Sequence, residues 1–457
     1  MIKFIKSHAV QFILLCIIAI AIIARLYLYG DIRLSIGNAE THSYINSSSA
    51  PLFSWNMFAG KRLFTTNLIY KIALDHKACP LMDVNHPAAQ QHNDREIQPC
   101  FDGIAVAQTF LSILGWCLLT WTTSRWLKSP ALKISAAVLI IFFAFTPQIA
   151  EWDSNLSPES LSLSLFMITF ALLQEIVFRT TQNKASMDAR GDRLLIAGFL
   201  LVFALWIFVR DVHLYSILVT LVLLAPFFLV RTARKSRTLF VVFVLLLGLF
   251  ALGFVSARDG RRAQIPLTHS FDDYILPYPS RMKFFDWLGM PDVHSPSYQA
   301  WFDAHATMTY GAFILSHPGF VINTLWYNKD YFRANYEQPF FNTRQSLLLM
   351  VGEIVHPETL AVFFLDLLLF ALLCYKALRD KDRNMIGWVW MAAWFLCCNG
   401  ATLLVSFFGD TAGVLRHIFP SVEMFRFFLW MLLFIVADGF LNGGTNPVLE
   451  NHRNIDP

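Results

Sequence analysis

One short stretch of the sequence places a carboxylate where it can accept a proton from a hydroxyl group. In segment 30–62, Asn38 follows Gly37 and is a suitable N-cap, so Glu40 falls in the first turn of the predicted helix. The helix dipole favours an ionised carboxylate there, and Tyr44, four residues later, lies on the same face. Activation of an acceptor hydroxyl requires an anionic group of this kind. A glutamate that merely caps the helix explains the pattern as well.

A second group of carboxylates lies in segment 147–164, which is otherwise free of charge. It contains Glu151, Asp153 and Glu159, and Pro158 suits the first position of a helix that follows. Two interpretations stay open. The carboxylates form a solvated loop, or they face the acidic residue of the first stretch across a cavity.

Two basic sites interrupt apolar runs. Arg210 and Asp211 stand between two runs with hardly any loop, where charge is costly unless it faces a cavity or a partner. They form either an internal ion pair or an anion site. Asp410 precedes Arg416 and His417 at the start of the last run, and an arginine with a histidine at a membrane surface suits a phosphate or pyrophosphate group.

The elements that position these residues are membrane spans. The 457 residues are 56% hydrophobic, include 43 Phe and are only 15% charged, with a mean hydropathy of +0.50. A soluble protein of this length needs more charge on its surface, so this is a polytopic integral membrane protein. No basic tract with interleaved aromatics indicates a nucleic-acid partner, and no cysteine spacing indicates a zinc site.

The apolar runs predict an all-α membrane protein with about ten transmembrane helices and two large extracytoplasmic loops, 30–103 and 257–358. The predicted spans are 9–29, 104–124, 131–147, 159–178, 194–210, 212–230, 239–256, 359–376, 385–407 and 419–440. We expect an N-terminal module over 1–256, the large loop over 257–358, and a C-terminal module with its tail over 359–457.

Basic residues decide the orientation. They gather before the first span and in connections 125–133, 179–193, 231–237 and 376–383, all on one side. This asymmetry predicts that both termini are cytoplasmic and that the first span is retained rather than cleaved as a signal peptide. In a bacterium the protein would be a multi-pass protein of the inner membrane, and the loops would lie in the periplasm. Because the periplasm is oxidising, Cys79 and Cys100 of the first loop are predicted to form a disulfide.

Taken together, these motifs resemble the GT-C superfamily of polytopic membrane glycosyltransferases, which includes the protein O-mannosyltransferases and the aminoarabinose–lipid A transferases. The resemblance is greatest to unassigned bacterial members and covers nearly the whole chain. It rests on Glu40-Thr-His-Ser-Tyr44, Pro-Leu-Phe-Ser, Gly-Lys-Arg62, Leu-Ser-Pro-Glu-Ser at the fourth span, Arg210-Asp211, Gly-Asp410 with Arg416-His417, and Ile-Leu-Pro-Tyr-Pro-Ser-Arg in the large loop. The chain departs from its relatives in having Glu40 where many have Asp, and in stretch 76–103, which looks inserted.

The resemblance implies transfer of a sugar from a polyprenyl-phosphate or polyprenyl-pyrophosphate donor to a glycan, lipid or protein acceptor on the extracytoplasmic face. Glu40 would be the base of an inverting displacement, with Asp31 and Asp153 as the next candidates. The donor phosphate would be bound by Arg210, Arg416 and His417, with Arg62 as a weaker candidate. The other candidate site residues are Tyr44, Glu159, Asp211 and Asp410. Some relatives use a divalent metal and others do not, so the resemblance leaves metal dependence open.

Two other classes of membrane protein compete with this interpretation. O-antigen polymerases and ligases also have a large outer loop, but they rely on arginine-rich outer loops, whereas the first loop here carries the acid. A lipid-linked sugar flippase or transporter needs no base at Glu40, and neither inverted repeats nor interrupted midplane helices are evident. The sequence names neither the sugar, nor the acceptor, nor the prenyl length.

Overall fold

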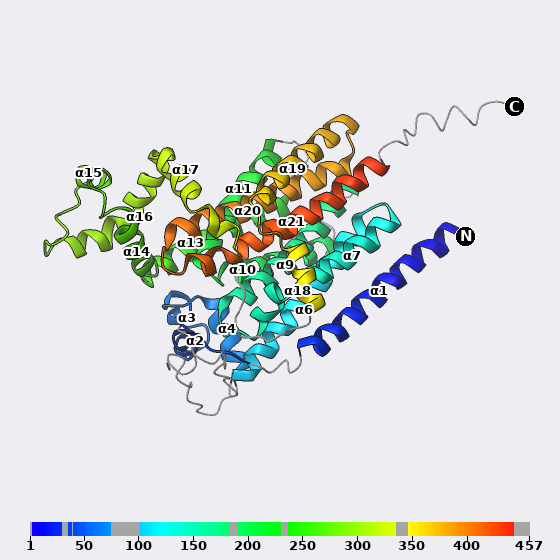
Figure 1. Ribbon diagram of the computed structural model, residues 1–457, viewed down its shortest axis with the longest axis horizontal. Helices are drawn as coiled ribbons and strands as arrows, with labels where there is room; N and C mark the ends of the chain where they lie inside the picture. Colours follow the sequence, from blue (N-terminus) through cyan, green and yellow to red (C-terminus); the bar gives the residue numbers. More distant parts are fainter. Residues whose placement is uncertain are drawn as a thin grey trace.

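The computed structural model describes residues 2–29, 35–38, 40–74, 101–182, 190–229, 236–334 and 346–442 (Figure 1). These stretches fold into α- and 3-10 helices, with one isolated β-bridge between Ile36 and Asn155. Asp31, Cys79 and Cys100 lie outside the described residues, so the predicted disulfide and the role considered for Asp31 stay predictions.

Eight helices of the described chain are long and apolar enough to cross a membrane. They are α1 (Ile2–Tyr29), α6 (Asp102–Trp126), α9 (Pro158–Gln182), the segment of η3 (Asp211–Leu214), α11 (Tyr215–Leu224) and η4 (Ala225–Leu229), α13 (Arg237–Asp259), α19 (Ala361–Asp380), α20 (Arg383–Gly409) and α21 (Val414–Asn442). A ninth crossing arises if α7 (Pro130–Phe145) and the segment Pro147–Ser154, bent by 57° from it, count as one span. That segment comprises α8 (Pro147–Ala150) and η2 (Glu151–Ser154).

The predicted all-α membrane fold is therefore confirmed, with a helix at each of the ten expected positions, although the number of clear spans is eight or nine. α10 (Arg190–Ile207) stands where the fifth span was expected, but it is not among the helices that are long and apolar enough to cross a membrane. Its 18 residues include Arg190, Asp192 and Arg193. The first residues of α1 and the last of α21 lie toward the same end of the bundle (Figure 1).

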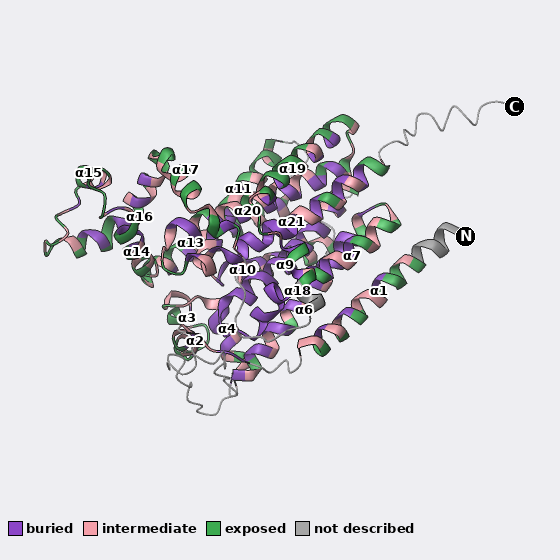
Figure 2. Cartoon of the chain, viewed as in Figure 1, coloured by how far each residue is buried: buried purple, intermediate pink, exposed green. Residues whose placement is uncertain are grey.

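α9 is the central helix of the bundle. In the most apolar stretch of α9, 83% of the residues are buried, against 17% in that of α1. α1 lies at the edge of the bundle beside α7 (Figure 2). α6 approaches α9 closely at Gly115, where a Cβ atom would lie 2.7 Å from the carbonyl oxygen of Ser164. On another face of α9, the rings of Phe166 and Phe170 stack with Trp394 of α20 at centroid distances of 5.9 and 6.0 Å. Close packing of this kind, rather than exclusion of water, holds helices together in lipid.

Two groups of short helices lie at the end of the bundle opposite the chain ends (Figure 1). The first loop forms α2 (Thr41–Ser48), α3 (Trp55–Ala59) and α4 (Phe64–Ala73). The second forms α14 (Gln264–Tyr274), α15 (Pro279–Trp287), α16 (Tyr298–Ser316) and α17 (Pro318–Tyr327). Further along the chain follow η5 (Lys329–Phe332) and α18 (Ser346–Val355).

The second group has an aromatic core of its own and is joined to the bundle by hydrogen bonds. The ring of Phe271 packs edge-on against Phe285, 5.0 Å away. The hydroxyl groups of Tyr310 and Ser270 donate to the carbonyl oxygen of Phe408 at 2.9 and 3.0 Å. Phe408 is next to the last residue of α20, so these bonds position the second group beside the start of α21.

Candidate active site

The turn before α2 positions Glu40. The helix begins at Thr41, one residue after Glu40, so Glu40 precedes the helix rather than lying in its first turn as predicted. The side-chain oxygen of Asn38 accepts the backbone N–H of Glu40 at 2.9 Å, and the Thr41 hydroxyl accepts that of Asn38 at 2.8 Å. The carbonyl of Glu40 accepts from Ser43 and Tyr44 at 2.9 and 3.3 Å, which closes the first turn. The backbone of Glu40 is thus fixed by local sequence.

Contacts with the segment before α9 hold this turn against the bundle. Ile36 forms the isolated bridge with Asn155, and the side-chain amide of Asn38 donates to the Asn155 side chain at 3.1 Å. The Thr41 hydroxyl reaches the carbonyl oxygen of Leu156 at 3.1 Å. These contacts place the start of α2 beside the start of α9.

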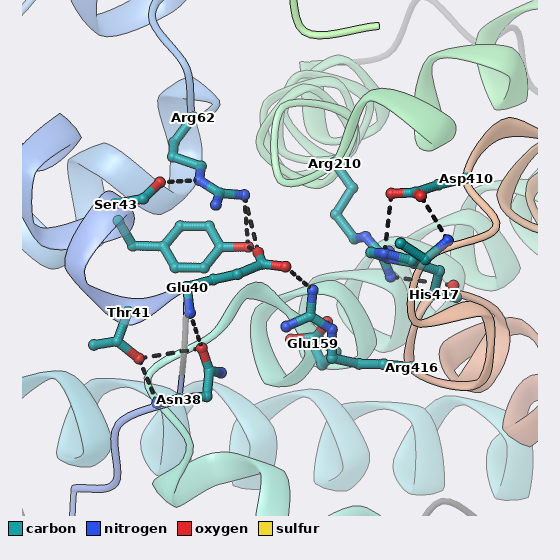
Figure 3. A network of polar contacts seen from close by, with 12 residues as sticks. Asn38, Glu40, Thr41, Ser43, Arg62, Glu159, Arg210, Asp410, Arg416 and His417 are labelled. Atoms are coloured by element: carbon teal, nitrogen blue, oxygen red, sulfur yellow. Dashed lines mark hydrogen bonds and ion pairs between the residues drawn. The ribbon is translucent and has the colours of Figure 1, made fainter. Parts of the chain in front are cut away.

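The carboxylate of Glu40 meets three side chains from three parts of the chain (Figure 3). The Tyr44 hydroxyl donates to Oε2 at 2.9 Å, and Arg62 Nη1 lies 3.1 Å from the same oxygen. Nη2 of Arg416 contacts Oε1. Burial alone would raise the pKa of Glu40, but the guanidinium groups of Arg416 and Arg62 lower it to about 2. The group is therefore a carboxylate at neutral pH, as the sequence predicted.

Arg62 is held in place against Tyr44. Its guanidinium lies 4.1 Å from the centre of the Tyr44 ring, donates to the Tyr44 hydroxyl at 3.1 Å and donates to Ser43 Oγ at 2.5 Å. Burial raises the pKa of the Tyr44 hydroxyl, which keeps its proton to donate to Glu40. The predicted pairing of Tyr44 with Glu40 is thus present, and Arg62 joins the same cluster.

Arg416 also reaches a second carboxylate. Its Nε lies 3.6 Å from Oε1 of Glu159, in the first turn of α9. The Glu159 side chain is 1% exposed, and its Oε2 has no hydrogen-bond partner among the described residues. Different edges of one guanidinium therefore contact Glu40 and Glu159. Glu159 is therefore buried rather than part of a solvated loop, and the guanidinium of Arg416 lies between it and Glu40.

Arg210 pairs with His417 rather than with its neighbour Asp211. Its Nη2 lies 2.8 Å from Nδ1 of His417, and its Nη1 donates to the His417 carbonyl at 3.3 Å. Asp211 instead receives two hydrogen bonds from Arg262, at 2.8 and 2.9 Å. The internal pair considered for Arg210 and Asp211 is not formed. Within the described part of the chain, Arg210 has no carboxylate partner.

Asp410 completes the surroundings of His417. Its carboxylate accepts from His269 Nδ1 at 2.9 Å and from the Ala412 amide at 3.0 Å, and it lies 3.4 Å from His417 Nε2. Burial raises the pKa of Asp410, but contacts with the two histidines hold it below its ordinary value. Because a guanidinium only donates, His417 Nδ1 is the acceptor of Arg210, which leaves the ring proton on Nε2 facing Asp410.

Arg262 was not singled out from the sequence, although it supports two candidate residues at once. Besides its two bonds to Asp211, it donates to the carbonyl oxygens of Gly60 at 3.1 Å, Phe58 at 3.3 Å and Ser256 at 3.0 Å. Its side chain is 5% exposed. Asp211 adjoins one candidate phosphate-binding arginine, and Gly60 lies two residues before another. The sequence signal was the run of charge 258–262 directly after a predicted span.

Asp153 has a different environment from Glu40. It forms a buried ion pair with Arg25 of α1 at 2.7 Å and accepts the Ser160 hydroxyl at 2.6 Å. Both charged side chains are at most 5% exposed. Within the described part of the chain, neither side chain forms a hydrogen bond or ion pair with Glu40. The pair attaches α1 to the bundle, and the catalytic role considered for Asp153 stays a prediction.

A second polar network is completely buried. Thr146 lies 2.7 Å from His356 Nε2, His356 Nδ1 contacts Glu423, and Arg426 donates to Glu423 at 2.6 Å. Arg426 and Glu423 are three residues apart on α21. This order of hydroxyl, imidazole and carboxylate occurs at nucleophilic sites, but His356 and Glu423 are at most 1% exposed. We interpret it as a tie between the bend after α7, α18 and α21.

No group of three or more histidine, cysteine or acidic residues that could hold a metal ion occurs in the described stretches. The carboxylate oxygens of Glu40 face guanidinium and hydroxyl donors rather than other acids. A shared metal cage around Glu40 therefore has no support in the arrangement of these side chains.

No family model matches the chain, and neither does any curated protein. Solved structures of the oligosaccharyltransferase of Archaeoglobus fulgidus are similar in fold at low scores. The apo form has 14% sequence identity and a TM-score of 0.45, covering 97% of this chain and 52% of that one. The complex of archaeal oligosaccharyltransferase AglB with an inhibitory peptide and a dolichol-phosphate has 14% identity and a TM-score of 0.41, covering 98% and 52%.

A third structure of that enzyme, a complex with Zn and sulfate, has 12% identity and a TM-score of 0.44, covering 96% of this chain and 51% of that one. This chain thus spans about half the length of the proteins it matches. These three structures are of oligosaccharyltransferases rather than of the O-mannosyl or aminoarabinose transferases named above, and at these scores they assign no activity to the chain.

Proposed function

We propose that the chain is a membrane glycosyltransferase that moves a sugar from a polyprenyl-phosphate or polyprenyl-pyrophosphate donor to an acceptor hydroxyl. One observation carries the proposal. Glu40, from the first loop, lies in ion-pair contact with Arg62 and Arg416, and the latter adjoins the Arg210–His417 pair. A base and several cationic groups are thus assembled at one place, as a direct displacement at a sugar phosphate requires.

The proposed reaction is a single inverting displacement. The acceptor oxygen attacks the anomeric carbon while the bond from that carbon to the phosphate oxygen breaks, and the bonding electron pair stays on the phosphate. The proton of the acceptor hydroxyl passes to the carboxylate of Glu40. After the product leaves, Glu40 loses this proton to solvent and is a carboxylate again. Of the two described candidates for the base, Glu40 has the exposure for this role, because its side chain is 32% exposed and that of Asp153 is 3% exposed.

Arg210 is the proposed first anchor for the donor phosphate. Because it has no carboxylate partner within the described residues, its charge is the one least compensated in the site. His417 lies against Arg210, while Arg416 and Arg62 contact Glu40 nearby (Figure 3), and these three are the further candidate donors. A guanidinium binds phosphate oxygens through paired N–H groups, which orients the leaving group as well as neutralising it.

The position of the cluster suits a donor held in lipid. Arg416 and His417 follow Val414, the first residue of the last span, and Glu159 lies in the first turn of α9. Ends of spans lie near the lipid headgroups, where a prenyl-anchored phosphate also lies. The short helices of both loops surround this end. From the basic-residue asymmetry we propose that it faces the periplasm of a bacterial inner membrane, with both termini cytoplasmic.

The test uses the purified full-length chain in detergent. A panel of synthetic polyprenyl-phosphate and polyprenyl-pyrophosphate sugars, radiolabelled in the sugar, is incubated with envelope glycan, lipid and protein acceptors. The proposal expects transfer from at least one donor, with inversion at the anomeric carbon. If the protein instead carries labelled lipid across proteoliposomes and no labelled acceptor forms with any donor, it is a flippase or transporter and the proposal is wrong.

A further inference from the structure

We propose that Glu40 and the donor phosphate use the same two guanidinium groups in turn, so that Glu40 becomes available as a base only after the donor has bound. This inference rests on the proposed function and concerns the order of events within it. Its basis is that Arg62 and Arg416 contact the carboxylate through the N–H groups that a phosphate would need.

The charges of the cluster balance in the absence of donor. Arg62 and Arg416 supply two positive charges, and Glu40 and Glu159 supply two negative ones. Arg210 remains as a cation without a carboxylate in the described structure. A sugar–phosphate–prenyl diester carries one negative charge, which Arg210 can match. The donor can therefore begin to bind while Glu40 keeps its partners.

The reaction then moves one negative charge from Glu40 to the phosphate. When the anomeric bond breaks, the leaving phosphate gains a second negative charge. At the same time Glu40 takes the acceptor proton and becomes neutral. The two guanidinium groups that had bound the Glu40 carboxylate can then bind the phosphate, which now carries the additional negative charge. The total charge around them stays constant, so the site requires little reorganisation as charge develops.

The two contact edges of Arg416 allow this exchange without loss of its position. Nη2 contacts Glu40, while Nε lies 3.6 Å from Glu159. Glu159 is 1% exposed and its Oε2 has no partner in the described region. The Nε edge can remain on Glu159 while Nη2 turns from the carboxylate to a phosphate oxygen. We assign Glu159 as the positioning residue that retains Arg416 in the site.

The exchange also solves a difficulty for catalysis. With both arginines in contact, the pKa of Glu40 is about 2, and such a carboxylate is a weak base at neutral pH. Burial acts in the opposite direction and is the largest single influence. When a phosphate draws Arg62 and Arg416 away, burial and the Tyr44 hydrogen bond remain and the pKa rises. Binding of the donor thereby strengthens the base.

The competition predicts that removing the charge of Glu40 improves binding of the leaving group. The probe is farnesyl monophosphate, titrated into the full-length protein in detergent by calorimetry. Glu40→Gln should bind it about tenfold more tightly than the natural protein, because no carboxylate then competes with the phosphate for the N–H groups of Arg62 and Arg416. The matched control is Glu175→Gln, which removes a carboxylate from two arginines at the other end of α9 and should leave affinity unchanged.

Arg416→Gln provides the second arm. In that background, Glu40→Gln should improve binding less than threefold, because Arg416 is one of the two guanidinium groups for which Glu40 and the phosphate compete. Equal or weaker binding by Glu40→Gln than by the natural protein overturns the inference while leaving the phosphate site intact. If Glu40→Gln does not yield folded protein, Glu40→Ala is measured against the same criterion. Absence of any binding to the natural protein and to all variants overturns the phosphate site, and the proposed function with it.

Discussion

The guanidinium of Arg416 contacts the carboxylate of Glu40, 376 positions earlier in the chain. The pair joins the start of the last span to the turn that follows the first span, and both residues had been singled out for separate chemical roles. Arg62 lies on the other oxygen of the same carboxylate at 3.1 Å. Two arginines predicted to bind phosphate and the residue predicted to act as base therefore form one ion-pair cluster.

The pH dependence of transfer should differ between kcat/KM for the donor and kcat. Only ionised Glu40 accepts a proton, so activity falls as pH falls through its pKa. In the donor-free protein that pKa is about 2, and kcat/KM, which reports the free enzyme, should show no acid limb from Glu40 above roughly pH 4. The limb of kcat, which reports the donor complex, should lie at higher pH. Coinciding limbs in the two profiles would contradict the exchange of partners.

Arg210→Gln should weaken donor binding with little effect on folding. The variant loses a guanidinium that has no carboxylate partner among the described residues, and the KM for the donor should rise about 30-fold or more if the phosphate contact is desolvated. Arg193→Gln, at the exposed start of α10, is the control and should behave as the natural protein does. Steady-state kinetics with varied donor measures the difference. An unchanged KM in Arg210→Gln would remove Arg210 from the phosphate site.

Arg262→Gln should reduce both stability and donor affinity. It leaves Asp211 and the carbonyl oxygens of Phe58 and Gly60 without their donor, which should lower the free energy of unfolding by about 2–3 kcal/mol. Because Arg210 and Arg62 adjoin these groups, donor KM should rise more than kcat falls. Arg261→Gln at the exposed neighbouring position is the control. A loss of stability with unchanged KM would make Arg262 a structural residue alone.

Asp153→Asn should separate a structural carboxylate from the catalytic one. Breaking the buried pair with Arg25 leaves an uncompensated charge and should cost about 3–5 kcal/mol of stability. Transfer per folded molecule should stay close to normal, since Asp153 does not contact the cluster. Thermal unfolding in detergent, together with activity below the unfolding temperature, tests both points. Stable protein without activity would support Asp153 as the base.

Part of this arrangement follows from local sequence. Apolar runs locate helices at all ten expected positions, and the spacing of four residues places Tyr44 beside Glu40. Contacts that cross long distances in the chain could not be predicted in this way. Arg210 pairs with His417 rather than with its neighbour Asp211. The Asp211 carboxylate is instead bound by Arg262, 51 positions after Asp211. Asp153 was grouped with Glu40 on charge alone, and its pairing with Arg25 of α1 depends on how the bundle packs.

The number of spans illustrates a further limit of local patterns. α10 is a helix of the expected length, but its first turn contains Arg190, Asp192 and Arg193. The chain also continues past the predicted end of the third span into a helical segment, Pro147–Ser154, which is bent by 57° from α7. His269, a neighbour of Asp410, gave no signal in the sequence, because its role arises only when the second group of short helices folds onto the start of α21.

The most direct test of the account is sugar transfer by Glu40→Gln. The substitution keeps the shape of the side chain and removes its charge, so the protein should fold, insert and bind donor. With the donor that supports transfer by the natural protein, turnover should fall by about 10²-fold or more, the usual effect of losing an acid–base group, while Glu175→Gln stays close to normal. Near-normal transfer by folded Glu40→Gln would contradict the account, because the carboxylate at its centre would then have no part in the reaction.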